Sequence, residues 1–425
     1  MDVPWFLIIS IVVVAMQAFA LFLAFFEPSL RYKISRPIAA PLDSEHYLRM
    51  VSTLCGANAF HHSTVQTLTN GEVFYEAELS AIRTARRSIT LEAYIFQKGK
   101  IAKRFVDALA ERARAGVKVN LVLDAIGSFA TWNSYFADLT AAGGRVCWYH
   151  GFRWHTLPRL NHRTHRELLI IDGEVAFLGG AGIADHWFYG STRNPPWRDT
   201  MFRVEGEAVA GLQGSFVENW LEASGELLTE DDYLCFAERP SERPVLVVNS
   251  SPSTGSSTRG RILFQTLMAS ATRSLQITTP YFLPDRGVRA ELIHALERGV
   301  RVRIVAPGKK SDHLLTRRSS RRLYGDLLKA GAEIYEYQPS MIHTKSMIVD
   351  GAWCIVGSSN FDHRSFSIND EVNLATYDPR LASRLNQDFV CDVAASHLVT
   401  YQEWRRRPLY ERFHEVWGRL LERQQ

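Results

Sequence analysis

The amino-terminal end of the chain is a long apolar segment followed by basic residues. From Val3 to Phe26 the sequence is almost wholly apolar, and a helix of this length reaches roughly 36 Å, enough to cross a hydrocarbon layer of about 30 Å. Nothing basic precedes the segment, whereas Arg31 and Lys33 follow it. This order favours a retained anchor over a cleaved signal peptide and orients the rest of the chain toward the cytoplasm. We therefore expect a single-pass protein of the cell membrane, with a transmembrane helix and linker in residues 1–40.

The remainder of the chain carries one pattern of apolar and polar positions twice. An Ala-x-Arg-Ser sequence followed by a mostly apolar run occupies residues 85–96 and occurs again at 271–282. A Gly-Val turn followed by a β-branched run occupies 116–122 and recurs at 299–305. Between these runs the apolar positions follow helical spacing, so each copy predicts strand, helix, strand, helix and strand. The chain is therefore an internal repeat.

Strands that alternate with helices are typical of α/β architecture. We predict an α/β protein with two similar α/β/α sandwich lobes, residues 41–225 and 226–425, preceded by one N-terminal transmembrane helix. The total of 425 residues agrees with more than one domain.

Composition narrows the possible functions. Lys and Arg number 49 against 45 Asp and Glu, a net charge of +4, which argues against nucleic acid as a partner. The 5 cysteines are widely scattered and form no CxxC pair, so neither a disulfide framework nor a structural zinc site is expected. A reducing compartment fits this cysteine usage.

The second lobe contains a dense group of polar residues in the pattern HxKxxxxD followed by GSxN. The group consists of His343, Lys345, Asp350, Ser358 and Asn360. On a strand, residues two apart share a face, so His343 and Lys345 point into one site. An imidazole beside an ammonium suits phosphoryl chemistry, because one acts as nucleophile or acid while the other binds charged oxygens. Ser358 and Asn360 add neutral donors for the same oxygens.

The first lobe contains a related motif with the same spacing, from His165 to Asp172. Glu167 stands where the second lobe has its lysine, and Gly182 stands where it has Asn360.

With these motifs the chain resembles the phospholipase D superfamily, and within it the two-lobe, membrane-anchored bacterial cardiolipin synthases. The stretches 279–285 and 357–374 are similar to the same family. The resemblance implies a pseudo-dimer of phospholipase D-like lobes, phosphatidyl transfer between two phosphatidylglycerols to give cardiolipin and glycerol, and a phosphohistidine intermediate. It implies no cofactor and no metal.

The resemblance also implies residue roles. His165 is expected to be the nucleophile and His343 the general acid and then the base. Asp199 and Glu371 are expected to orient the two histidines. Asp172 and Asp350 are expected to make structural bonds near a turn.

Glu167 and Gly182 depart from the family pattern. A carboxylate two residues from His165 faces the phosphate and repels it unless it is protonated or paired with a cation. Arg166 points to the opposite face of the strand, so Arg163 or Arg198 is the candidate for the missing positive charge and for substrate binding. The alternative is a weakened or inactive first motif.

Several functions stay open on the sequence. Water instead of an alcohol as acceptor gives a phospholipase D hydrolase, the same histidines serve in membrane-tethered nucleases, and a degenerate first motif gives a non-catalytic lipid-binding protein. The near-neutral net charge counts against a nuclease.

Overall fold

A computed structural model gives the fold. It describes residues 4–25, 33–35, 38, 40–151, 161–190, 194–229, 231–234, 243–251 and 258–408.

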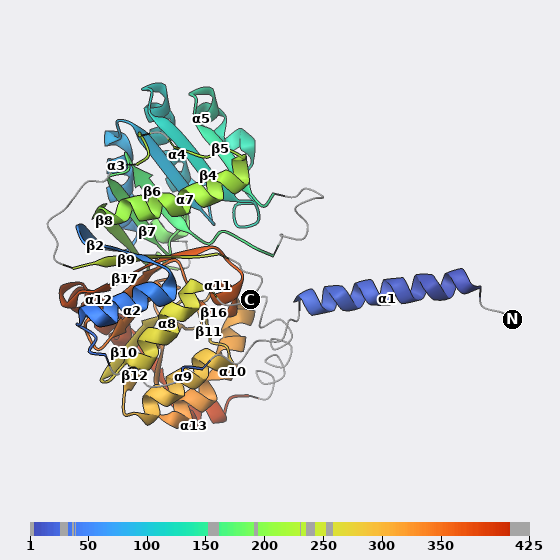
Figure 1. Ribbon diagram of the computed structural model, residues 1–425, viewed down its shortest axis with the longest axis vertical. Coiled ribbons are helices and arrows are strands. Elements are labelled where there is room, and N and C mark those ends of the chain that lie inside the picture. Colours follow the sequence, from blue (N-terminus) through green and yellow to red (C-terminus); the bar gives the residue numbers. More distant parts are fainter. Residues whose placement is uncertain are drawn as a thin grey trace.

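The first lobe is built on a seven-stranded sheet of order β2-β8-β7-β6-β3-β4-β5 (Figure 1). Strands β3, β4 and β5 are parallel, and the others pair antiparallel. The strands are β2 (Ser63–Thr69), β3 (Ser88–Ala93), β4 (Lys118–Asp124), β5 (Arg145–Tyr149), β6 (Glu167–Ile171), β7 (Val175–Gly179) and β8 (Thr200–Gly206).

The second lobe is built on a nine-stranded sheet of order β1-β9-β17-β15-β14-β10-β12-β13-β18. Without β1 and β18, this order repeats that of the first sheet strand for strand. The predicted duplication and the α/β class are therefore confirmed. The strands are β1 (Asn58–Phe60), β9 (Val245–Ser250), β10 (Ser274–Thr278), β12 (Arg301–Pro307), β13 (Glu333–Tyr337), β14 (Ser346–Val349), β15 (Trp353–Gly357), β17 (Glu371–Tyr377) and β18 (Ser396–Val399), with a separate pair β11 (Phe282–Leu283) and β16 (Phe361–Asp362).

Helices cover the outer face of each sheet and fill the space between the sheets. On the first sheet the outer helices are α3 (Gly71–Thr84), α4 (Lys100–Arg114) and α5 (Ala137–Ala141). On the second they are α2 (Glu45–Cys55), α8 (Arg259–Ser270), α9 (Arg286–Glu297) and α10 (Leu314–Ala330). Between the sheets lie α7 (Ala208–Ser224) and α12 (Pro379–Ala394). Short helical segments are η1 (Asn133–Phe136), α6 (Asp185–Phe188), α11 (His363–Ser367) and α13 (Tyr401–Arg405).

The period of two along each strand determines which core a side chain joins. In β6, Leu169 and Ile171 enter the core under the outer helices, whereas Leu168 and Ile170 enter a core shared by both lobes. In that shared core the inner face of the first sheet, α7, α12 and the inner face of the second sheet pack together. The lobes therefore meet through a continuous apolar layer.

The strand and helix before the first sheet belong to the second lobe. Strand β1 pairs with β9, and α2 places Tyr47 and Val51 in the core of the nine-stranded sheet. The expected first lobe, 41–225, therefore does not coincide with one sheet, because its first elements cross to the other. The sequence repeat has no counterpart for these elements, so it gave no signal for the crossing.

Helix α1 (Trp5–Phe25) stands apart from both lobes in Figure 1, and those of its side chains that the structure describes are exposed. In the described parts of the chain, no helix combines the length and the apolar character needed to cross a membrane. Residues 26–32 of the expected anchor and linker lie outside the described residues.

Candidate active site

Each histidine motif is joined by backbone hydrogen bonds to the opposite lobe. The His165 N–H donates to the Asp370 carbonyl at 2.9 Å, and the His343 N–H donates to the Arg198 carbonyl at 2.7 Å. These bonds belong to two isolated bridges, Thr164 with Asp370 and Arg198 with Ile342. As a result, the residue after each bridge partner, Glu371 or Asp199, is carried to the histidine of the other lobe.

The histidine side chains also contact carboxylates of the opposite lobe. His165 Nδ1 lies 3.2 Å from Glu371 Oε1, and His343 Nδ1 lies 3.0 Å from Asp199 Oδ2. Both carboxylates are fully buried. The contacts orient the rings with Nδ1 toward the carboxylates, which leaves Nε2 as the reactive nitrogen. The sequence identified both carboxylates as orienting groups but left open which histidine each one serves.

Hydrogen bonds hold the two carboxylates in place. Glu371 accepts from the hydroxyls of Ser358 and Ser365. Asp199 accepts from the Trp187 indole at 3.0 Å and from the Thr200 N–H at 2.7 Å. Burial alone raises the pKa of Asp199, but the interactions with His343, the charge of Lys345 and the Thr200 N–H outweigh it and leave that pKa lowered. Asp199 is thus ionised at neutral pH. Ser358, expected to contact substrate, instead positions Glu371.

Lys345 lies behind the histidine of its own lobe. Its Nζ is 3.3 Å from the Gly180 carbonyl and 3.4 Å from His343 Nδ1. Burial lowers the pKa of Lys345, while Asp199 and Glu371 oppose that effect. A Cβ at position 180 would stand only 2.9 Å from this Nζ and 2.8 Å from the His343 carbonyl. The absence of a side chain at Gly180 therefore lets the second lobe's ammonium approach the first lobe.

Glu167 and Gly182, the two departures from the family pattern, touch each other. A Cβ at position 182 would lie 3.0 Å from Glu167 Oε1 and 2.5 Å from the Ile95 carbonyl. The Ile95 N–H donates to the same Oε1 at 3.3 Å. Burial raises the pKa of Glu167 well above its usual range, although Ile95 and Lys345 act in the opposite direction. A neutral carboxyl does not repel phosphate, which removes the electrostatic objection to an active first motif.

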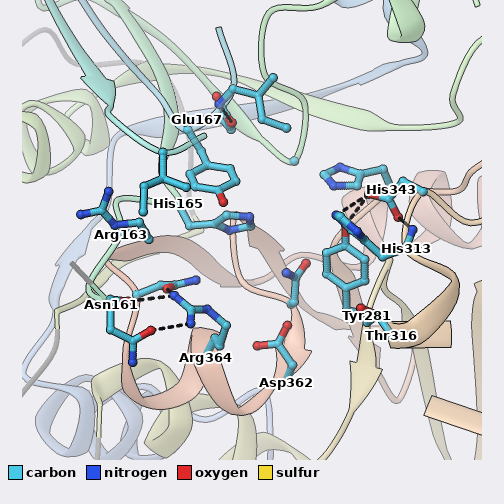
Figure 2. Close-up of a pocket in the computed structure, with 17 residues that line it drawn as sticks. Asn161, Arg163, His165, Glu167, Tyr281, His313, Thr316, His343, Asp362 and Arg364 are labelled. Carbon is cyan, nitrogen blue, oxygen red and sulfur yellow. Dashed lines mark hydrogen bonds and ion pairs between the residues drawn. The ribbon is translucent and has the colours of Figure 1, made fainter. Parts of the chain in front are cut away.

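A cavity of about 810 Å³ opens between the lobes at the two histidines (Figure 2). Its wall includes His165, His343, Glu167, Asn360 and Arg163. The Asn360 Oδ1 is buried without a hydrogen-bond partner in the described structure. A buried acceptor oxygen left open in this way is suited to a hydroxyl of a ligand, which can donate to it.

The two arginines proposed for substrate binding differ in position. Arg163 lines the cavity and forms an ion pair with buried Asp124 at 3.3 Å. Arg198 is not part of the cavity wall; its guanidinium binds Asp392 through two contacts of 2.9 and 3.0 Å. Arg198 therefore braces the lobes behind the site and does not face a ligand, because the carboxylate on α12 draws its side chain away. As expected from the strand face, Arg166 points to α7, where it binds Glu218 at 3.0 Å.

The motif aspartates form equivalent turns outside the cavity. The Asp172 carboxylate accepts from the N–H groups of residues 86–88, and Asp350 accepts from those of residues 272–274. Both residues have positive φ, of 55° and 52°. Each aspartate thus ties the end of its motif strand to the start of the neighbouring strand.

The structure adds cavity residues that the motifs did not indicate. Tyr281 donates to Asp312 at 2.5 Å near His343. Asp362 and Arg364 come from the segment just after the GSxN sequence. Burial raises the pKa of Asp362 to about 6. Asp362 and Arg364 follow Asn360 closely in the sequence, so the GSxN motif could have pointed to them. Asp312 lies in a loop that contains no motif, so the sequence offered no comparable signal.

Two lobes of like topology that share a cavity with two carboxylate-bound histidines define a phospholipase D-like enzyme fold. The family model described as "Cardiolipin synthase, PLD-like domain" matches residues 79–194 and 264–392. The chain belongs to this family.

Relatives and solved structures agree with that assignment. The chain is 34% identical to the cardiolipin synthase of Geobacillus kaustophilus over 84% of its own length and 72% of that protein. It is also 34% identical to cardiolipin synthase 2 of Bacillus anthracis, over 89% of its length and 74% of that protein. The crystal structure of phosphatidylserine synthase from Haemophilus influenzae superposes with a TM-score of 0.68 at 15% identity, covering 90% of this chain and 100% of that one. That likeness shows the fold.

Proposed function

We propose that the protein is a phosphatidyltransferase that converts two phosphatidylglycerols to cardiolipin and glycerol. The observation that carries the proposal is the cavity between the lobes, into which two histidines are directed by buried carboxylates of the opposite lobe. Membership of the cardiolipin synthase family supplies the substrate class. Each half of the site supplies one histidine and one orienting carboxylate.

The first step transfers a phosphatidyl group to the enzyme. His165 Nε2 attacks the phosphorus of the donor, the bond from phosphorus to the glycerol oxygen breaks, and His343 gives its proton to that oxygen. Glycerol leaves, and a phosphohistidine remains. The charge of Lys345 stabilises the developing negative charge.

The second step returns the group to an alcohol. A hydroxyl of the second phosphatidylglycerol gives its proton to His343 and attacks the phosphorus, and the bond from phosphorus to His165 breaks. Cardiolipin forms and both histidines return to their starting states. The ionised Asp199 stabilises the imidazolium that His343 becomes when it accepts this proton.

The protonation of His343 is set by the substrate in this scheme. Burial and then Lys345 lower the pKa of His343, with Asp199 acting against them. A phosphate anion in the cavity raises this pKa again. His343 therefore takes up its catalytic proton as the donor binds, which is compatible with His165 as the nucleophile.

The hydrolase is the main competing function, because water could accept the phosphatidyl group in the second step. Incubation of the full chain with labelled phosphatidylglycerol in vesicles separates the possibilities. Cardiolipin with glycerol supports the proposal, phosphatidic acid supports the hydrolase, and absence of turnover supports a lipid-binding protein. His343→Ala should abolish turnover, whereas His61→Ala, at an exposed histidine outside the cavity, should not change it.

We also propose that the amino-terminal apolar segment holds the lobes at the cytoplasmic face of a membrane. The support is the exposed apolar surface of α1, where Trp5, Phe6 and Ile9 are at least 60% accessible. At about 1.5 Å per residue, α1 is roughly 32 Å long. Flotation of the full chain with vesicles tests the attachment, and the double substitution Ile9→Arg and Val13→Arg should leave the protein in the soluble fraction. Protease digestion of closed vesicles tests the sidedness.

A further inference from the structure

Arg364 is a cavity cation that lacks a carboxylate partner. Its Nη1 donates to the Asn161 side-chain oxygen at 2.8 Å, and its Nη2 donates to the Asn161 carbonyl at 2.8 Å and to Asn369 at 3.2 Å. All of these acceptors are neutral, and no ion pair links Arg364 to a carboxylate of the described residues. By contrast, Arg163 in the same wall is paired with Asp124.

An unpaired guanidinium in a largely enclosed position is costly, because buried charges are normally paired. Burial lowers the pKa of Arg364, and although Asp362 acts against this effect, Arg163 adds to it. Arg163 and Arg364 are the two arginines of the cavity wall. Asp124 forms an ion pair with Arg163, whereas Asp362 acts on Arg364 electrostatically without an ion pair.

The position of this cation differs from that of the reacting phosphate. In Figure 2, Asn161, Arg163 and Arg364 lie on the side of His165 that faces away from His343. The donor phosphorus must lie between the two histidines, near Lys345 and Asn360. The guanidinium of Arg364 is thus placed for a second anion in the same cavity.

We propose that Arg364, held by Asn161 and supported by Arg163, binds the phosphodiester of the acceptor lipid. This inference rests on the proposed function, in which both substrates are phosphatidylglycerols and the acceptor brings a phosphate of its own. Arg364 fixes that phosphate so that the free glycerol hydroxyl of the acceptor reaches the phosphohistidine. Guanidinium groups suit this task, because their N–H donors match phosphate oxygens in pairs. Arg364 donates three hydrogen bonds within the protein, which leaves N–H groups for a ligand.

The site also gives a reason for choosing a lipid acceptor over water or free glycerol. Water and glycerol are uncharged, so neither gains binding energy from a charged contact with Arg364. An acceptor phosphodiester gains a charged contact and orientation at the same time. Arg364 is thus a specificity-determining residue for the second step and does not take part in bond breaking.

One assay separates the two uses of the cavity. Vesicles of phosphatidylglycerol are incubated with labelled free glycerol, and two products are measured together. Labelled phosphatidylglycerol reports formation of the phosphohistidine and its attack by glycerol, and cardiolipin reports attack by the lipid acceptor. Arg364→Gln should lower the ratio of cardiolipin to labelled phosphatidylglycerol at least tenfold, and Arg364→Lys should lower it less. Asn161→Ala should shift the ratio in the same direction, because it loosens Arg364 without removing the charge.

The control is Arg301→Gln, at an exposed arginine on β12 that pairs with Glu333 far from the cavity. It should change neither product. If Arg364→Gln and Asn161→Ala lower both products by the same factor, Arg364 serves the donor phosphate and the proposal is wrong. If the two substitutions change neither product, the proposal is also wrong. If the unaltered protein makes neither product, the proposed function itself fails. A melting temperature for each variant distinguishes loss of fold from loss of selectivity.

Discussion

Glu371 holds the imidazole of His165 at 3.3 Å across the boundary between the lobes, although 206 residues separate the two in sequence. Asp199 makes the reciprocal contact with His343, over a separation of 144 residues. Each lobe therefore supplies a histidine to the cavity and the orienting carboxylate for the other lobe's histidine. Neither lobe contains a complete catalytic pair.

The exchange of carboxylates predicts which histidine responds to each substitution. We expect Glu371→Gln to alter the ¹⁵N signal of His165 Nδ1 and leave that of His343 unchanged, with Asp199→Asn doing the reverse. Turnover should fall about 10²- to 10⁴-fold in each variant, because an amide supports the wrong tautomer. NMR of histidine-labelled protein provides the check. A response of the histidine within the same lobe would contradict the cross-lobe pairing.

The roles of the two histidines can be separated with a leaving group that needs no proton. With a phosphatidyl ester of p-nitrophenol, His343→Ala should still release one equivalent of p-nitrophenolate in a burst, because only the acid is missing. His165→Ala should show no burst, since it lacks the nucleophile. Stopped-flow absorbance measures the burst, and an alkaline quench preserves the phosphohistidine for mass analysis. The opposite pattern would assign the nucleophile to His343.

Glu167 should act as a neutral group. We expect Glu167→Gln to keep turnover within about threefold, because the amide preserves the shape of a protonated carboxyl. Glu167→Lys should lower turnover by roughly 10- to 100-fold, since it places a second ammonium near buried Lys345. Initial rates at pH 7 test both variants. Full activity of the lysine variant would show that the site tolerates the family's residue, and that Glu167 has no particular fit to Gly182.

Glu78 on α3 should make the protein less stable at alkaline pH. Burial raises its pKa to about 8, from an ordinary value of 4.5. Between these pH values the unfolded chain has released a proton that the folded chain retains, so stability falls as pH rises. The full difference corresponds to roughly 5 kcal/mol at pH 8 and above, as an upper limit.

Thermal unfolding at two pH values tests the effect of Glu78. Glu78→Gln should raise the melting temperature at pH 8 by several degrees and change it little at pH 4.5. Glu72→Gln, at an exposed glutamate of the same helix, serves as the control and should show no such difference. An equal change at both pH values would attribute the effect to packing and not to ionisation.

The parts of the fold that repeat in sequence could be predicted, because strand and helix periods are local. The strands around residues 88–93 and 274–278 and their parallel neighbours follow from apolar runs and Gly turns. The crossing of β1 and α2 to the second sheet could not, since pairing partners far apart in sequence leave no local pattern. The shared core around α7 and α12 also depends on contacts between lobes.

The parts of the site that belong to sequence motifs could be predicted. His165, His343, Asp199 and Glu371 do meet at one cavity. The function of Ser358 and Arg198 could not be read from spacing, because each is captured by a buried carboxylate that tertiary structure brings to it. Arg364 was not predicted, because what distinguishes it is that it forms no ion pair with a carboxylate of the described residues. Whether an arginine forms an ion pair depends on the tertiary structure and cannot be read from the sequence.

The reciprocal carboxylates have an evolutionary consequence. In a symmetric dimer, if one residue contacts a second across the two-fold axis, the second contacts the first in return. The contacts between His165 and Glu371 and between His343 and Asp199 have this form within one chain. A dimer of identical chains carries the same residue at both equivalent positions of such a site. A single chain that contains both lobes is free of this constraint, so the first lobe can carry Glu167 where the second carries Lys345.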